Sequence, residues 1–200
     1  MKTMIYILTC VLAMLFIGCT YYTPYLISLK EVERSDVTVE RYGGNKVEVV
    51  DTLGIKFEDD LLRIIWIPTK SRFNFTLSNK TQHSMKIIWD EAIYVNEVGI
   101  SQGVTHLGVK YTDHSISQPP SVVIRDGLIN DFVLPSDNIY YSSGWVEKAL
   151  FPNISDSKSI SLIKAEKYIG STVQILLPIE IQGTVNEYIF TFEVEGIVLP

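Results

Sequence analysis

The chain has 200 residues, enough for one domain with a sizeable core, and 46% of them are hydrophobic. Its formal net charge is −6 and no stretch clusters Lys and Arg, which argues against nucleic acid as a partner because phosphate contacts need basic groups. β-Branched and aromatic residues recur in short alternating runs, a pattern typical of strands.

The N-terminus is an uncharged hydrophobic run. Lys2 supplies a positive charge, and residues 4–17 then carry none. This run is shorter than the roughly 20 residues that a membrane-spanning helix needs, and it lacks the polar face of a surface helix. It is typical of the hydrophobic region of a secretory signal, so residues 1–18 are predicted to be a signal peptide.

The signal ends in the run Leu15-Phe16-Ile17-Gly18-Cys19, which resembles the lipobox of bacterial lipoproteins. In that family a small residue precedes a cysteine that becomes the lipidated first residue. Gly18 fits this pattern, whereas Phe16 replaces the usual Leu. The resemblance implies that Cys19 carries acyl chains such as palmitate, which anchor a protein stably when there are two or more. Simple secretion, with Cys19 left as a free thiol, is the alternative.

Other features bear on where the protein resides. The other cysteine, Cys10, would leave with the signal, so no disulfide is expected in the folded domain. Thr20, in place of an Asp, favours the outer membrane of the cell envelope if the organism has one. Residues 19–35 are predicted to be a tether, in which Tyr21, Tyr22 and Tyr25 either lie at the lipid headgroups or pack on the domain.

Residues 36–200 are predicted to form a single β-domain. Strands are expected at 46–52, 61–67, 72–79, 84–95, 103–111, 121–126, 128–135, 172–182 and 185–197, with one helix within 156–170. The apolar strand 61–67 should be buried on both faces. Asp90-Glu91 predicts a bend, Pro178 an edge position or a bulge, and Gly183-Thr184 a type II′ hairpin.

About seven to nine short strands predict an all-β, immunoglobulin-like antiparallel β-sandwich with Greek-key wiring, with a small β-barrel as the alternative. The segment FNFTLSN at 73–79, followed by a turn and the run at 87–99, resembles a pattern in small immunoglobulin-like domains of bacterial envelope lipoproteins. That resemblance implies a fold and a location, and it supplies no activity.

The histidines offer the only sequence-based candidate for catalysis. Asp113 and His114 are adjacent, and His106 lies eight residues before His114. Neighbouring residues of an extended chain point to opposite sides, the spacing matches no zinc signature, and no nucleophile elbow is present. We therefore expect no metal, no cofactor and no catalytic residue, and we expect that the protein is not an enzyme.

Aromatic loop segments offer a binding surface. Residues 138–145 are rich in Tyr, Ser and Trp, and Tyr140, Tyr141 and Trp145 either pack under a loop as a satellite core or face a partner. The expected function is a lipid-anchored, non-catalytic binding or scaffolding module for an envelope protein or a glycan. The alternative is an envelope enzyme or enzyme accessory factor with a site in the loops near His106 and His114.

Overall fold

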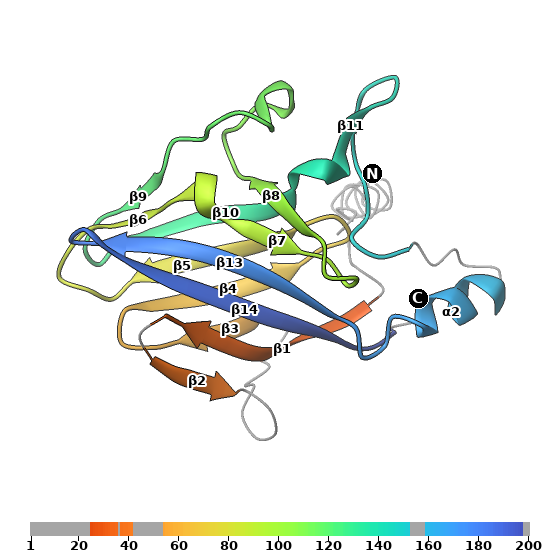
Figure 1. Ribbon diagram of the computed structural model, residues 1–200, viewed down its shortest axis with the longest axis horizontal. Helices are drawn as coiled ribbons and strands as arrows, with labels where there is room; N and C mark the ends of the chain where they lie inside the picture. Colours follow the sequence, from red (N-terminus) through yellow and green to blue (C-terminus); the bar gives the residue numbers. More distant parts are fainter. Residues whose placement is uncertain (1–24, 36, 42–53, 153–158, 198–200) are drawn as a thin grey trace, which may run out of the picture.

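A computed structural model of the chain describes residues 25–35, 37–41, 54–152 and 159–197 (Figure 1). The strands are β1 (Tyr25–Arg34), β2 (Val37–Arg41), β3 (Ile55–Glu58), β4 (Leu62–Pro68), β5 (Phe73–Asn79), β6 (Met85–Ile87), β7 (Ile93–Val95), β8 (Ser101–Thr105), β9 (Ser121–Val123), β10 (Leu128–Pro135), β11 (Ile139–Tyr141), β12 (Trp145–Glu147), β13 (Thr172–Ile181) and β14 (Thr184–Ile197). The helix is α2 (Ser159–Glu166), and short 3-10 turns are η2 (Trp89–Glu91), η3 (Tyr111–Asp113) and η4 (Ser136–Asn138). The predicted signal peptide, Cys19, Tyr21, Tyr22 and the strand expected at 46–52 lie outside these residues.

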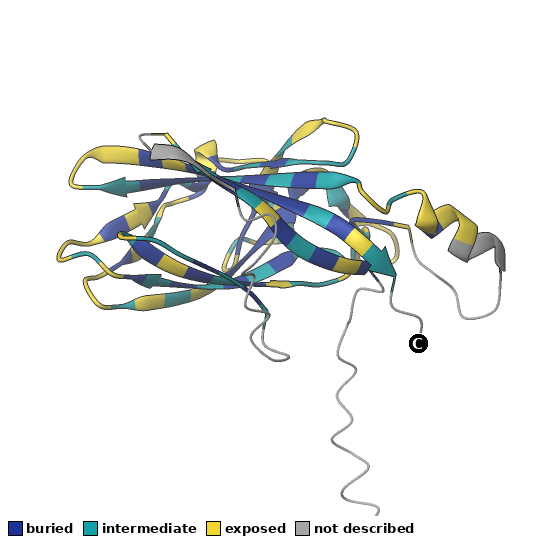
Figure 2. Cartoon of the chain, turned by 90° about the horizontal axis from the view of Figure 1, so that it is seen from below, coloured by how far each residue is buried: buried dark blue, intermediate teal, exposed yellow. Residues whose placement is uncertain are grey.

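The fold is all-β, as predicted, and most strands belong to one large sheet. Its strand order is β2-β1-β14-β13-β7-β8-β10-β5-β4-β3, β6 pairs with both β13 and β9, and β11 pairs with β12 separately. The sheet curls on itself until it is nearly barrel-shaped, so that its two halves face each other (Figures 1 and 2). This arrangement fits the expected β-sandwich or small barrel, although its strands are more numerous than expected.

Aromatic side chains fill the space between the two halves. Trp66 of β4 is fully buried, and its ring centroid lies 5.1 Å from that of Phe190 and 5.5 Å from that of Phe192, both on β14. Burial alternates along β4, where Arg63 and Ile67 are exposed. The expectation that this strand is buried on both faces is therefore wrong, because its outer isoleucines face solvent rather than a second layer.

The predicted tether to residue 35 is wrong from Tyr25 onward. Residues 25–34 form β1, which pairs antiparallel with β14, and Ile27 and Leu29 point into the core. Tyr25 is also buried, and its hydroxyl donates a hydrogen bond of 2.8 Å to the carbonyl of Pro152. Burial raises the pKa of Tyr25 to about 12. This ring therefore packs on the domain and does not lie at a lipid headgroup.

Pro178 lies in an inner strand with a continuous register to β14, rather than at the edge or the bulge that was expected. β13 pairs with β14 on one side and with β6 and β7 on the other. The predicted bend at Asp90-Glu91 is confirmed as η2, which separates β6 from β7. The carbonyl of Pro178 accepts a hydrogen bond from the Ile88 amide at 3.0 Å, so its ring nitrogen faces this same interruption. Because the partner strand breaks there, a residue without an amide proton is tolerated.

The hairpin between β13 and β14 differs by one residue from the prediction. Ile181 pairs with Thr184, so the loop residues are Gln182 and Gly183, with φ of 52° and 81°. Two positive φ angles define a type I′ turn rather than the expected type II′ turn.

Other predicted elements have mixed outcomes. The strands at 72–79 and 128–135 and a helix within 156–170 are confirmed, and the strands expected at 103–111 and 121–126 end early, at residues 105 and 123. No helix in the described ranges is both long and apolar enough to cross a membrane.

Candidate functional site

The hairpin of β11 and β12 carries the predicted aromatic residues and projects from the curled sheet (Figure 1). The exposed fractions are 48% for Tyr140, 70% for Tyr141 and 45% for Trp145. Ser143 and Gly144 form its turn with positive φ angles. The rings therefore lie on the surface, and they do not form a satellite core.

The exposed rings are held in a fixed arrangement. The Tyr141 and Trp145 centroids are 5.6 Å apart at 76°, and the Trp145 and Tyr111 centroids are 5.9 Å apart at 80°. Edge-to-face pairs of this kind are favoured by the ring quadrupoles. Tyr111 is the first residue of η3, at the end of the strand predicted for 103–111, and sequence reasoning missed its place beside the hairpin. We call Tyr111, Tyr141 and Trp145 the aromatic platform.

Glu147 fixes the base of the aromatic platform. Its carboxylate accepts hydrogen bonds from the hydroxyls of Tyr111 and Ser71, and the Arg72 guanidinium lies 3.6 Å from its Oε1. Burial and the Glu147 carboxylate raise the pKa of Tyr111 to about 12, so its hydroxyl remains a donor at neutral pH. Arg72 also lies over the Phe132 ring, 4.3 Å from its centroid, and so links the platform to β10.

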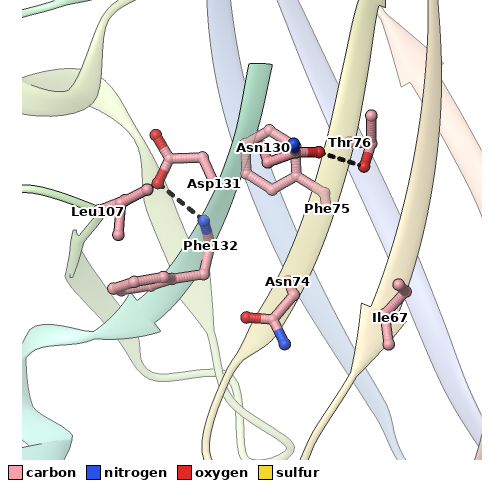
Figure 3. A pocket seen from close by; sticks show the side chains of 8 residues that line it. All are labelled: Ile67, Asn74, Phe75, Thr76, Leu107, Asn130, Asp131 and Phe132. Carbon is pink, nitrogen blue, oxygen red and sulfur yellow. Dashed lines mark hydrogen bonds between the residues drawn. The ribbon is translucent and has the colours of Figure 1, made fainter. Parts of the chain in front are cut away.

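The outer face of β4, β5 and β10 adjoins the platform. The strand register places outward-facing side chains in two rows across these strands: Ile67, Asn74 and Phe132 in one row, and Ile65, Thr76 and Asn130 in the other. Most of these side chains, with Leu107, line a hollow of about 290 Å³ (Figure 3). We call this feature the outer-face hollow.

The outer-face hollow presents uncharged polar groups. Thr76 Oγ1 donates a hydrogen bond to Asn130 Oδ1 at 2.7 Å, and the Asn130 amino group has no acceptor among the residues that the structure describes (Figure 3). Asn74 makes no hydrogen bond through its side chain in the described part of the chain. The Asp131 carboxylate is buried, where it accepts hydrogen bonds from the backbone amides of Leu107 and Phe132 at 2.7 and 2.8 Å.

His106 belongs to a buried pair rather than to the predicted loop site. Its Nδ1 lies 3.3 Å from Asp131 Oδ2, and its ring stacks on Trp89 at 4.2 Å and 5°. No hydrogen bond or ion pair among the described residues joins His106 to Asp113 or His114. Asp131 is 25 residues away in sequence and is brought to His106 by the pairing of β8 with β10, which sequence spacing alone does not indicate.

Two further observations bear on chemistry at this site. His106 Nε2 is buried and has no hydrogen-bond partner in the described structure. Across the same residues, no group of three or more His, Cys, Asp or Glu side chains is arranged to hold a metal ion.

Comparisons of the chain with protein-family models, with curated proteins and with solved structures each find no match. The function of the hairpin and the hollow is therefore argued from their own chemistry.

Proposed function

We propose that the protein is a lipoprotein of the bacterial cell envelope that is anchored through lipid on Cys19. The uncharged run at 4–17 and the lipobox-like segment at 15–19 support this anchor. Thr20 after the cysteine favours the outer membrane where the organism has one. The domain that follows acts as a non-catalytic binding or scaffolding module for an envelope protein or a glycan.

The aromatic platform carries the binding part of this proposal. Tyr141 is 70% exposed and Trp145 45% exposed, yet ring contacts and the Glu147 network hold them in place. Rigid aromatic side chains lose little conformational entropy on association, and Tyr and Trp dominate the binding energy of many interfaces. An exposed ring set that is already ordered is therefore suited to recognition.

A second candidate function is an envelope enzyme or accessory factor that uses His106. One observation favours it: the buried ring nitrogen without a partner among the described residues calls for an explanation, and a catalytic role is one of those that such groups have. We rank it lower because the ring is only 6% exposed and stacks on Trp89, which leaves little access for a substrate.

One paired experiment tests the proposed function. Cells producing the full chain are labelled with palmitate, and the wild type should be labelled whereas Cys19→Ala should not. The purified protein is then used to capture components of an envelope extract. The double variant Tyr141→Ala/Trp145→Ala should lose the captured component, while Leu26→Ala, at a residue 51% exposed on β1, should retain it.

Two results would contradict the proposal. If the wild type is not labelled with palmitate, the proposed lipid anchor on Cys19 is wrong. A large loss of thermal stability in the double variant would mean that the platform is part of the folding core, and capture would then no longer report on a binding surface.

A further inference from the structure

We propose that the outer-face hollow and the aromatic platform together bind a neutral oligosaccharide. This inference rests on the proposed function, since it names the ligand of the same binding module. It is carried by three properties, namely the lack of a free charge among the residues that line the hollow, the hydrogen-bonding groups of the hollow, and the exposed rings beside it.

The residues that line the outer-face hollow offer no free formal charge to a charged ligand, since Asp131 is the charged residue among them. Arg72 and Glu147 lie 3.6 Å apart, and Glu147 also accepts hydrogen bonds from two hydroxyl groups. The Asp131 carboxylate is buried and takes two backbone amides. Anionic ligands need unpaired Arg or Lys, and the net charge of −6 adds repulsion at long range. An uncharged ligand fits these conditions.

The polar groups of the hollow match sugar hydroxyls. Within the described ranges, neither the Asn74 side chain nor the amino group of Asn130 has a hydrogen-bond partner, and the Thr76–Asn130 bond fixes the second amide in orientation. A side-chain amide both donates and accepts, as a sugar hydroxyl does. These groups stand in cross-strand rows with Ile67 and Phe132, so one ligand can meet apolar and polar atoms together.

The exposed rings extend the surface beyond the hollow. Phe132 lines the hollow and contacts Arg72, which in turn lies beside Glu147 at the base of the platform. The faces of Tyr141 and Trp145 carry the negative part of the ring quadrupole, to which the C–H groups of a pyranose are attracted. One sugar in the hollow and a neighbour on the rings would form a continuous contact.

The size of the hollow also favours a saccharide over a folded protein. Its volume of about 290 Å³ lies just below the range of roughly 300–1,000 Å³ that is usual for small-molecule sites, so it can hold one sugar unit rather than a larger group. A stable protein partner buries roughly 1,200–2,000 Å² in total, which calls for a broader surface than this hollow. A protein partner is accordingly treated as an alternative outcome of the test.

The test uses the full-length protein in a detergent that lacks a sugar headgroup. It is applied to an array of neutral hexasaccharides of glucose, mannose, galactose and N-acetylglucosamine, with oligogalacturonate as the acidic comparison. We expect at least one neutral sugar to bind, with an affinity that is insensitive to salt. Binding should shift the fluorescence of Trp145, because Trp66 and Trp89 are buried, and Trp145→Phe should abolish that shift.

Matched variants locate the site. Asn74→Ala should weaken binding about tenfold, as expected for the loss of one hydrogen bond, without loss of stability. Gln82→Ala, an exposed amide in the turn before β6, should leave the affinity unchanged.

Each outcome is decisive. The inference is overturned if no neutral sugar binds, if only the acidic sugar binds, or if Asn74→Ala binds as the wild type does. If no sugar binds but platform-dependent capture from the envelope extract persists, the proposed function stands and its ligand is a protein. If no sugar binds and no component is captured from the envelope extract, the proposal that the domain is a binding module is wrong.

Discussion

Asp59 connects the two halves of the sheet through side chains. Its Oδ2 accepts hydrogen bonds of 2.7 Å from Arg34, at the end of β1, and from the hydroxyl of Tyr188 on β14. Burial raises the pKa of Tyr188, so this hydroxyl stays a donor. In the described residues β3 pairs only with β4, and these polar contacts therefore bridge a place where the ladder does not close.

Glu58, the neighbouring residue, makes stability depend on pH. Its carboxylate is paired with Arg63 at 2.8 Å and with Lys80 and Lys56 at 3.0 Å, and the hydrogen bonds from these groups hold its pKa well below the ordinary value of 4.5. Because the folded pKa lies below the unfolded one, this contribution is complete above about pH 4.5 and is lost as the pH falls further.

The corresponding prediction concerns Glu58→Gln. At pH 7 the variant should unfold at a lower urea concentration than the wild type, and the difference should shrink as the pH falls below about 4.5. High salt should also reduce the difference, since the carboxylate is partly exposed and salt screens such pairs. A difference that is constant from pH 7 to acidic pH would contradict the assignment.

Several residue-scale features could not be predicted from the sequence. The exposed tyrosines and tryptophan of the hairpin were identified as candidates, because Tyr and Trp in a loop are recognisable as residue types. Their partner Tyr111, and Asp131 beside His106, are far away in sequence and meet through the register of β8, β10 and the hairpin. A contact of this kind is a property of the folded sheet, and no local pattern encodes it.

At the scale of elements, the alternation of apolar and polar residues predicted strands, but it did not predict how the strands pair. The sequence of β5 alternates cleanly between apolar and polar residues, and the structure confirms this strand. β1 alternates in burial over residues 25–29, but its sequence YLISL does not alternate, because the exposed Leu26 is apolar, and its position after Pro24 favoured a tether. Pro178 was expected at an edge or at a bulge, because the interruption of its partner strand by η2 depends on the pairing and not on the proline itself.

Replacing each of three glycines by alanine should lower the free energy of unfolding by different amounts. Gly183 has a φ of 81° and open space where a Cβ would lie, so Gly183→Ala should cost about 1 kcal/mol from backbone strain alone. Gly54, with a φ of 125°, would also bring a Cβ within 2.4 Å of the Trp66 carbonyl oxygen, so Gly54→Ala should cost more.

Gly103 is the matched control for this series. It lies in β8, has no positive φ, and has open space where a Cβ would be, so Gly103→Ala should change stability little. Chemical denaturation should therefore rank the losses as Gly54→Ala, then Gly183→Ala, then Gly103→Ala. Equal losses for Gly183→Ala and Gly103→Ala would mean that the type I′ turn does not form.

At the scale of the whole molecule, the folded domain includes residues 25–34, which form β1. The strand β1 is paired with β14 from Tyr25 to Arg34. It buries four hydrophobic side chains against the core, those of Tyr25, Ile27, Leu29 and Val32. Burial of each such side chain contributes about 1.5–3 kcal/mol, and a domain is stable by only about 5–15 kcal/mol. β1 is therefore required for folding, which a tether would not be.

Two truncated chains and two point variants test this boundary. A chain that starts at Tyr25 should melt cooperatively, whereas one that starts at Asp36 should not, because it lacks β1. In the full-length protein, Leu29→Ala should cost about 2–5 kcal/mol, since Leu29 is 2% exposed. Leu26, on the same strand but 51% exposed, provides the control, and Leu26→Ala should cost little. The melts are measured by circular dichroism. If the chain that starts at Asp36 melts cooperatively, residues 25–35 are not needed for folding and the prediction of a tether is correct.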